Sequence, residues 1–232
     1  MTDEAGPGRA ATYDAWYATP LGAAAHRIEL GLVAELAEPL REEKALDAGC
    51  GTGIYSGWLA GLGLSVTGVD HDSEMLEAAR HRVPEGRFVE AGVTDLPFAD
   101  GEFDLAVAIT VSCFLSAAER RAAARELVRV TRPGGRMVVG ELARYSLWAA
   151  QRRVKGWLGS ATWHSARFMT AGELKSCLLD AGAAAVTVRH ALYVPPVDRA
   201  AVVTRAETCE RLGQRLGSFG AAFVAARADV AR

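Results

Sequence analysis

The stretch Ala45–Gly53, Ala-Leu-Asp-Ala-Gly-Cys-Gly-Thr-Gly, joins an apolar run, a carboxylate and three glycines at alternate positions. A helical pattern begins directly after it, in Ile54–Leu59. Glycine lacks a Cβ, so the backbone can turn sharply here and approach a ligand closely. A helix that starts behind such a turn directs unpaired N–H groups and the positive end of its dipole at that ligand. The stretch therefore predicts a buried strand, a glycine turn and a helix that form a nucleotide-type ligand site.

The spacing of the glycines argues against two common nucleotide motifs. A dinucleotide fingerprint needs a third small residue where this chain has Ile54. This weighs against a Rossmann-like oxidoreductase, which is one alternative function. A P-loop needs Gly-Lys followed by Ser or Thr, and the stretch lacks that sequence too. The pattern is instead an acid, Asp47, two residues before the first of three alternating glycines.

Further motifs follow the glycine stretch in a fixed order. Asp70 ends the next strand pattern, about 20 residues beyond the glycines, a distance at which an acid reaches ribose hydroxyls. The later motifs are His71–Leu76, Asp95–Phe98, Phe103–Val107 and Arg129–Arg136. In this order, across Ala45–Glu141, the motifs resemble those of the class I S-adenosylmethionine-dependent methyltransferases.

The resemblance implies S-adenosylmethionine as the cofactor and gives roles to residues at the strand ends. Asp70 would accept both ribose hydroxyls through charge-assisted hydrogen bonds. The glycine backbone would hold the methionine part, with Asp47 orienting its amino group, and His71 and Met75 would flank the adenine. The expected cofactor-binding residues are Tyr13, Asp47, Gly49, Gly51, Gly53, Asp70, His71, Met75, Gly92, Val93, Thr94 and Thr110.

One position departs from the family pattern. Relatives usually carry an acidic or amide side chain for the adenine amino group where this chain has Gly92, which offers only its backbone. We expect the Val93 N–H to meet the adenine ring and Thr94 to take over part of the missing interaction. The departure gives some support to a second alternative, a non-catalytic protein that binds the cofactor as a sensor or scaffold.

Each motif also has a simpler structural explanation. Gly49 and Gly51 would serve a tight turn alone, and Asp70 would merely cap the next helix. These explanations account for single residues but not for the order of the motifs. The intact set of Asp47, the three glycines and Asp70 favours an enzyme over a scaffold.

Length and composition limit the remaining possibilities. The chain has 232 residues, half of them hydrophobic, with a net charge of −2, which gives no general basic bias toward nucleic acid. Its four cysteines are scattered without a Cys-x-x-Cys pair, which argues against a metal site or a disulfide framework. The N-terminus does not resemble a signal peptide, and no apolar run reaches the roughly 18 residues of a membrane helix. We therefore expect a cytoplasmic protein without an integral membrane segment.

Strand and helix patterns alternate along the chain, which predicts parallel strands joined by helical crossovers. The family resemblance adds a seven-stranded, doubly wound, Rossmann-like α/β sheet with its last strand antiparallel. The expected strands cover 44–48, 65–70, 86–90, 103–109, 136–141, 184–194 and 220–228. The expected helices cover 53–62, 73–82, 116–129, 170–180 and 198–213.

Three segments fall outside this alternation: a tail over 1–10, and a cap and an insertion within a single domain over 11–232. Residues 1–10 are rich in Gly and Pro and predict a mobile tail. The cap over 11–42 opens with Tyr13–Gly22, which resembles the cap that lies over the cofactor in small bacterial methyltransferases related to the quinone-biosynthesis branch. Its aromatic residues would alternatively be core.

The third segment is an insertion at 144–167, which carries five Arg and Lys residues and no acid. Its apolar side chains predict one helical face, with most of the cations off it. That face comprises Leu147, Trp148, Val154, Trp157 and Leu158. Ligands of α/β sheets bind beyond the carboxyl ends of strands, so the insertion would form a lid over the methyl acceptor. The alternative is a solvated basic helix.

The acceptor itself is not identified by the sequence. Methyl transfer is an in-line displacement that needs alignment and exclusion of water more than a catalytic triad. His164, His190 and Tyr193 are candidate bases, but none is assigned a catalytic role. The insertion predicts a small, largely apolar organic acceptor, with or without an anionic group, rather than nucleic acid.

Overall fold

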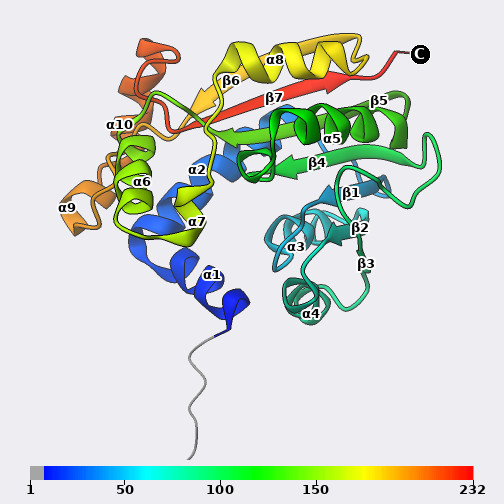
Figure 1. Ribbon diagram of the computed structural model, residues 1–232, viewed down its shortest axis with the longest axis horizontal. Helices are drawn as coiled ribbons and strands as arrows, with labels where there is room; N and C mark the ends of the chain where they lie inside the picture. Colours follow the sequence, from blue (N-terminus) through cyan, green and yellow to red (C-terminus); the bar gives the residue numbers. More distant parts are fainter. Residues whose placement is uncertain (1–7, 232) are drawn as a thin grey trace, which may run out of the picture.

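Seven strands form one sheet in the computed structural model, which describes residues 8–231 (Figure 1). Their order is β3-β2-β1-β4-β5-β7-β6, and neighbouring strands are parallel except where β7 pairs with β5 and β6. The strands are β1 (Lys44–Ala48), β2 (Ser65–Asp70), β3 (Arg87–Glu90), β4 (Phe103–Ile109), β5 (Thr131–Leu142), β6 (Ala185–Ala191) and β7 (Phe223–Asp229). The predicted Rossmann-like sheet with an antiparallel last strand is therefore confirmed.

Helices cover both faces of the sheet. Apolar side chains of α2, α3 and α10 pack on one face, and those of α5 and α8 pack on the other. The main helices are α1 (Arg9–Ala18), α2 (Pro20–Ala37), α3 (Ile54–Gly61), α4 (Ser73–Arg82), α5 (Ala117–Val130), α6 (Leu147–Trp157), α7 (Ala161–His164), α8 (Ala171–Asp180), α9 (Ala200–Val203) and α10 (Ala206–Gly213). Within residues 8–231, no helix is both long and apolar enough to cross a membrane.

The N-terminal cap consists of two helices. Thr19 separates them: its side chain accepts a hydrogen bond of 3.0 Å from the first turn of α2, and Pro20 occupies that turn. Most of the tail expected at 1–10 lies outside the described residues. Arg9 and Ala10, however, belong to α1, which starts two residues before the expected start of the cap.

The C-terminal third differs from the expected boundaries. The strand expected to reach residue 194 ends at Ala191, because Leu192 has a positive φ of 66°. The backbone N–H groups of Leu192 and Tyr193 donate to the carboxylate of Glu210 instead of to a strand, at 3.1 Å. The single helix expected at 198–213 is two short helices, α9 and α10.

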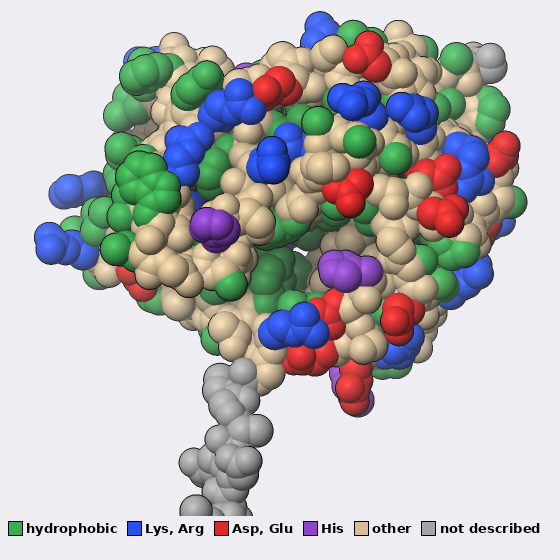
Figure 2. Space-filling model, viewed as in Figure 1, with side chains coloured by type: hydrophobic (Ala, Val, Ile, Leu, Met, Phe, Trp, Pro, Cys, Tyr) green, Lys and Arg blue, Asp and Glu red, His purple; other side chains and the backbone are tan. Residues whose placement is uncertain are grey.

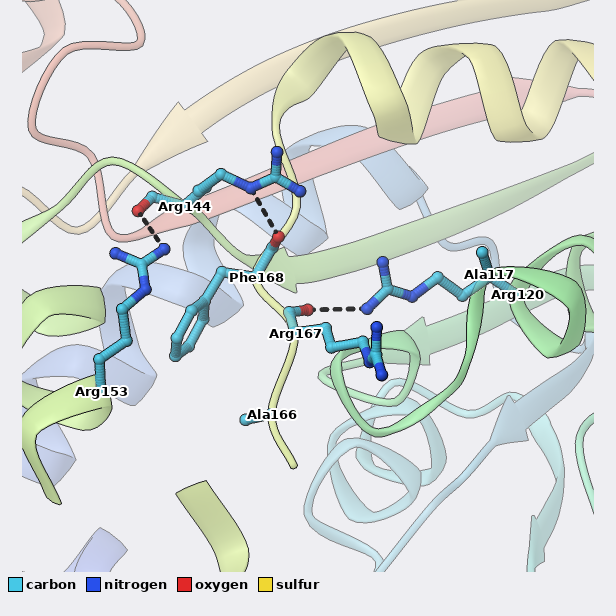
Figure 3. A pocket seen from close by; sticks show the side chains of 7 residues that line it. All are labelled: Ala117, Arg120, Arg144, Arg153, Ala166, Arg167 and Phe168. Carbon is cyan, nitrogen blue, oxygen red and sulfur yellow. Dashed lines mark hydrogen bonds between the residues drawn. The ribbon is translucent and has the colours of Figure 1, made fainter. Parts of the chain in front are cut away.

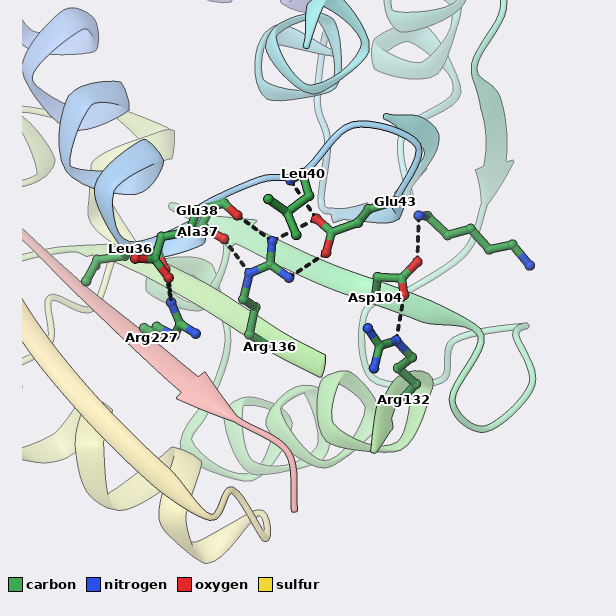
Figure 4. A network of polar contacts seen from close by, with 10 residues as sticks. Leu36, Ala37, Glu38, Leu40, Glu43, Asp104, Arg132, Arg136 and Arg227 are labelled. Carbon is green, nitrogen blue, oxygen red and sulfur yellow. Dashed lines mark hydrogen bonds and ion pairs between the residues drawn. The ribbon is translucent and has the colours of Figure 1, made fainter. Parts of the chain in front are cut away.

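An ion-pair network holds the end of α2 at the amino edge of the sheet, opposite the glycine loop (Figure 4). The buried guanidinium of Arg136 pairs with both oxygens of Glu43, at 2.7 and 2.8 Å. It also donates to the backbone carbonyls of Ala37 and Glu38. Arg227 of β7 pairs with the Glu38 carboxylate. The last turn of α2 is thereby fixed to β5 and β7.

Candidate active site

The glycine turn lies at the carboxyl end of β1, as predicted. Gly49, Gly51 and Gly53 have φ values of 74°, 52° and 78°, which side chains rarely tolerate. A Cβ on Gly49 would stand 2.4 Å from a methyl group of Val111, whereas a Cβ on Gly51 would meet nothing within 4 Å. The turn is packed from behind at Gly49 and open at Gly51, which gives a ligand room to approach the backbone.

Asp70 is held in place beside this turn by two backbone groups. One carboxylate oxygen accepts the Gly51 N–H at 2.9 Å, and the other accepts the Asp72 N–H at 3.0 Å. Each oxygen retains a second lone pair, so the side chain can still accept ribose hydroxyls. Asp72, not Asp70, caps α4 by accepting the Glu74 N–H at 3.0 Å, and the simpler explanation of Asp70 is wrong. The exposed ring of His71 lies beside Asp70, with Nδ1 at 3.3 Å.

Asp47 is the buried acid of the site. Its carboxylate is 2% exposed and accepts the Ser56 hydroxyl at 2.7 Å. Burial raises the pKa of Asp47 to about 6, against the opposing effect of the hydrogen bonds from Ser56. A nearby ammonium group would favour the charged form, so Asp47 fits the role of partner for an amino group.

The expected adenine-binding residues lie next to Asp70 as well. The backbone after β3 stays close to β2, because the Ala91 N–H donates to the carbonyl of Asp70 at 3.0 Å. Gly92 is exposed, and a Cβ there would meet only the hydroxyl of Thr94, at 3.8 Å. The side chain of Val93 packs against the apolar core. The loop therefore presents backbone rather than a carboxylate at position 92.

Thr110 directly follows β4 and has a strained conformation. Its φ is 57°, which is uncommon for a β-branched residue, and its N–H donates to the Gly140 carbonyl at 2.7 Å. Glu141, fully buried in β5, fixes the following turn by accepting the N–H groups of Ser112 and Cys113 at 2.7 and 3.1 Å. Burial raises the pKa of Glu141 to about 7. Sequence reasoning assigned no role to Glu141.

Helix α1 is fastened to the glycine turn by Asp14. The hydroxyl of the buried Thr52 donates to one Asp14 oxygen at 2.6 Å, and Arg82 of α4 pairs with the other at 2.6 Å. Arg82 also donates to the Thr52 carbonyl at 2.8 Å. Arg9 adds ion pairs to the start of α4. Sequence reasoning missed Asp14, although it lies within the aromatic motif that opens the cap.

Aromatic rings continue from α1 into the interior. The hydroxyls of Tyr13 and Tyr17 lie 2.9 Å apart, and their ring centroids are separated by 5.2 Å. The ring of Tyr17 meets His26 edge-on at 5.3 Å, and His26 meets Tyr55 of α3 at 5.6 Å. Within the described chain, the Tyr55 hydroxyl and His26 Nδ1 are buried without a hydrogen-bond partner.

Two buried charges adjoin these rings. Glu29 of α2 is 5% exposed, and the described residues provide its carboxylate with no hydrogen bond or ion pair. Burial raises the pKa of Glu29 to about 7, and the positive charge of Arg152 opposes this rise. The charge of Glu29 in turn helps to raise the pKa of Tyr55. We refer to His26, Glu29, Tyr55 and Arg152 as the buried polar cluster.

The insertion differs from its prediction. The expected apolar face is wrong: Trp157 and Leu158 are 85% and 82% exposed, and Leu147 and Val154 are exposed as well. The buried face contains Trp148, Ala149, Arg152 and Gly156. Arg152 turns inward because its guanidinium stacks over the rings of Trp148 and Trp163, at 5.1 and 4.8 Å.

Trp148 fixes the insertion to the rest of the fold. Its indole N–H donates to the Val194 carbonyl at 2.7 Å. A Cβ on Gly156 would lie 2.7 Å from the Trp163 carbonyl, so α6 and α7 cross closely. The surface is hollowed between α7 and α4, on the side of the molecule where α1 lies (Figure 2).

The three candidate bases do not meet at this site. His164 is exposed on α7, and His190 lies on the edge strand β6, remote from β1 in the strand order. The hydroxyl of Tyr193 donates to the Gly217 carbonyl. Glu29 is a further buried acid near the site that sequence reasoning did not single out. One sequence signal could have found it, because Ala25, Glu29 and Val33 follow one another at helical spacing on the buried face of α2.

Comparison with known proteins agrees with this geometry. Residues 46–139 match the family model described as a methyltransferase domain. A demethylmenaquinone methyltransferase of Beutenbergia cavernae is 42% identical over 102 residues, which are 44% of this chain and 41% of that protein. An uncharacterized protein of Mycobacterium tuberculosis is 32% identical over 188 residues, 81% of this chain and 62% of that protein. The chain thus spans about half the length of the curated relatives it matches.

A solved structure shares the fold along nearly the whole chain. It is a S-adenosylmethionine-dependent methyltransferase of Thermotoga maritima, described as a possible histamine N-methyltransferase, with a TM-score of 0.73 and 23% identity. The match covers 94% of each chain. Residues 46–139, which contain the glycine turn and Asp70, thus match a methyltransferase domain, and the solved structure shares its fold with nearly the whole chain.

Proposed function

We propose that the protein transfers a methyl group from S-adenosylmethionine to a small, largely apolar organic acceptor. The observation that carries the proposal is the buried polar cluster, which adjoins the cofactor-binding turn. Its Tyr55 hydroxyl and His26 Nδ1 are buried without a hydrogen-bond partner among the described residues. Buried polar groups in proteins are nearly always hydrogen-bonded, so such a set indicates a ligand that completes it.

The residues present fit the cofactor of the family. Asp70 would hold the ribose, the backbone from Gly49 to Gly53 would hold the methionine part, and Asp47 would pair with its amino group. His71, Met75 and the loop 92–94 would surround the adenine, and Tyr13 and Thr110 would complete the site. When bound, S-adenosylmethionine supplies an electrophilic methyl group on a sulfonium. The aromatic faces of α1 suit such a cation.

The chain's own contribution would be to bind, align and exclude water. The cap helix α1 and the insertion would cover the two ligands, which favours in-line transfer in a dry site. Glu29 and Arg152 would give an otherwise apolar acceptor a polar anchor. The raised pKa of Glu29, about 7, suits a carboxylate that takes up a proton near neutral pH. Trp148 would keep the insertion in place rather than contact the acceptor.

The relative from Beutenbergia cavernae is named for demethylmenaquinone, an organic ring compound. An acceptor of that general kind agrees with a site that is apolar except for a few buried polar groups. The exposed glycine at position 92 favours the second candidate function, a protein that binds the cofactor without transferring its methyl group.

Methyl-labelled cofactor tests both candidates. The full chain is incubated with tritiated-methyl S-adenosylmethionine and a cell extract, with Asp70→Ala as the matched control. We expect label in small molecules that partition into organic solvent, and none with the control. Label in protein or nucleic acid would contradict the acceptor class. Absence of transfer, with cofactor binding intact by calorimetry, would favour the scaffold.

A further inference from the structure

Four arginines surround a second cavity, outside the cofactor site. The cavity has a volume of about 290 Å³ and lies between the start of α5, the segment 166–168 and the insertion (Figure 3). Its lining consists of Ala117, Arg120, Arg144, Arg153, Ala166, Arg167 and Phe168. We refer to it as the arginine cavity. None of these residues belongs to the expected cofactor-binding set or to the buried polar cluster.

Backbone carbonyls hold three of the guanidinium groups. Arg120 donates to Ser112 and to Arg167, both at 2.8 Å. Arg144 donates to Phe168 at 3.1 Å, and Arg153 donates to Arg144 at 3.2 Å. The Arg153 guanidinium also lies 5.1 Å from the ring centre of Phe168. These contacts orient the groups without neutralising their charge, since a carbonyl is uncharged.

The carboxylates nearby do not balance the cations. Glu173 pairs with Arg144 at 2.7 Å. Glu141 is buried behind the wall of the cavity and is already hydrogen-bonded to Ser112. In the described chain, Arg120, Arg153 and Arg167 have no ion pair within 4.0 Å. Like charges around one hollow repel each other, and a multiply charged anion would remove that repulsion.

The lining of the arginine cavity is separate from the residues of the candidate active site. None of its residues belongs to the buried polar cluster or to the glycine turn. Its Phe168 packs in an apolar cluster with Cys113, and the Arg167 N–H donates to the Cys113 carbonyl at 2.7 Å. A ligand bound by these arginines is therefore independent of the proposed methyl transfer.

We propose that the arginine cavity binds the phosphoryl group of a small phosphate ester or diphosphate. Planar guanidinium forks match the oxygens of phosphate in two-point hydrogen bonds. The single negative charge of a carboxylate would not balance three unpaired cations, whereas the several negative charges of a diphosphate would. The volume is close to the lower end of small-ligand pockets, which leaves room for a diphosphate but not for a large organic ligand.

Inorganic pyrophosphate is the probe, and the test uses calorimetry on the full chain at low ionic strength. We expect Arg153→Gln combined with Arg167→Gln to weaken pyrophosphate binding at least tenfold. Lys155→Gln removes an exposed cation from the same helix, outside the cavity, and should change the affinity less than twofold. Thermal melting confirms that each variant is folded, and Arg153→Lys with Arg167→Lys should restore part of the affinity.

Several outcomes would overturn the proposal. Wild-type protein that binds no pyrophosphate at millimolar concentration has no phosphoryl site. An equal loss in Lys155→Gln would show general attraction to a basic surface. Citrate that binds as tightly as pyrophosphate would show a site for carboxylates. Affinity for the cofactor product, S-adenosylhomocysteine, should stay unchanged in the arginine variants, which separates this site from the methyltransferase site.

Discussion

The buried polar groups on the two sides of the candidate active site differ in their hydrogen bonding. On the cofactor side, Asp47 and Asp70 accept hydrogen bonds from Ser56, Gly51 and Asp72. The buried polar cluster instead leaves the Tyr55 hydroxyl and His26 Nδ1 without hydrogen-bond partners among the described residues. The acids of the cofactor side are thus already hydrogen-bonded within the protein, and we call this arrangement the completed frame. The polar groups of the cluster lack such partners.

The difference separates two ways of building a site. A frame fixed by backbone N–H groups is preorganised, so a ligand adds hydrogen bonds without reordering the protein. An incomplete cluster costs stability in the free protein and recovers it when a ligand supplies the missing partners. The cofactor side should therefore be sensitive to loss of single acids, and the cluster should be sensitive to pH.

The largest effect should come from the residue that holds the insertion over the cluster. Trp148→Ala should lower the free energy of unfolding by about 3–5 kcal/mol, because it leaves a cavity and an unpaired Val194 carbonyl. Trp157→Ala, on the exposed side of the same helix, should change it by less than about 0.5 kcal/mol. Urea denaturation measures both. Equal losses would mean that the two faces of α6 are assigned the wrong way round.

Glu29→Gln should remove part of the pH dependence of the free energy of unfolding. The folded-state pKa of Glu29, about 7, is above the usual value of 4.5, so the stabilisation from its proton is fully present below pH 4.5. It is lost as the pH rises through 7. The decrease in unfolding free energy between pH 5 and 8 should therefore shrink by about 2–3 kcal/mol in the variant.

Urea denaturation of the wild-type protein and of Glu29→Gln at pH 5 and pH 8 measures this difference. His26, whose pKa is lowered by burial, titrates in both proteins and so cancels in the difference. Glu77→Gln, on the exposed side of α4, is the control and should retain the wild-type dependence. An unchanged pH dependence in Glu29→Gln would show that this carboxyl is already charged and partnered in the folded protein.

Asp70→Ala tests the completed frame. It removes the acceptor of two ribose hydrogen bonds, each worth about 1.5–3 kcal/mol when charged, so affinity for S-adenosylmethionine should fall at least tenfold. Calorimetry measures it, with the exposed Glu85→Ala as the control. Wild-type affinity in Asp70→Ala would place the ribose elsewhere.

The smallest effect should come from the contact that joins α1 to the glycine turn. Asp14→Asn weakens a half-exposed ion pair with Arg82, and such pairs are worth about 0.2–1 kcal/mol. Cofactor affinity should fall two- to fivefold, whereas Glu35→Gln on the exposed side of α2 should leave it unchanged. Deleting residues 1–18 extends the test. A folded truncation with wild-type cofactor affinity would show that α1 does not close over the ligand.

The same contrast explains what could be predicted from the sequence. The cofactor side depends on local signals, namely glycines in a turn and acids at strand ends, and its secondary structure was predicted within a few residues. The cluster depends on tertiary contacts. Arg152 is buried because Trp163 stacks on it and Glu29, more than one hundred residues away in sequence, adjoins it. The helical pattern of apolar residues predicted the wrong buried face for the insertion. That prediction assumed that the cations of the helix are exposed, whereas Arg152 is buried.

The strand order also has a consequence for how the protein is made. In the described sheet β6 pairs with β7 alone, and β7 is the last strand of the chain. At about 5–20 residues per second, the ribosome adds the segment between them in roughly 2–6 seconds. Throughout that interval the nascent chain carries unpaired backbone on both β5 and β6, and such edges invite aggregation. Recombinant production should therefore benefit from slower translation at low temperature or from added chaperones.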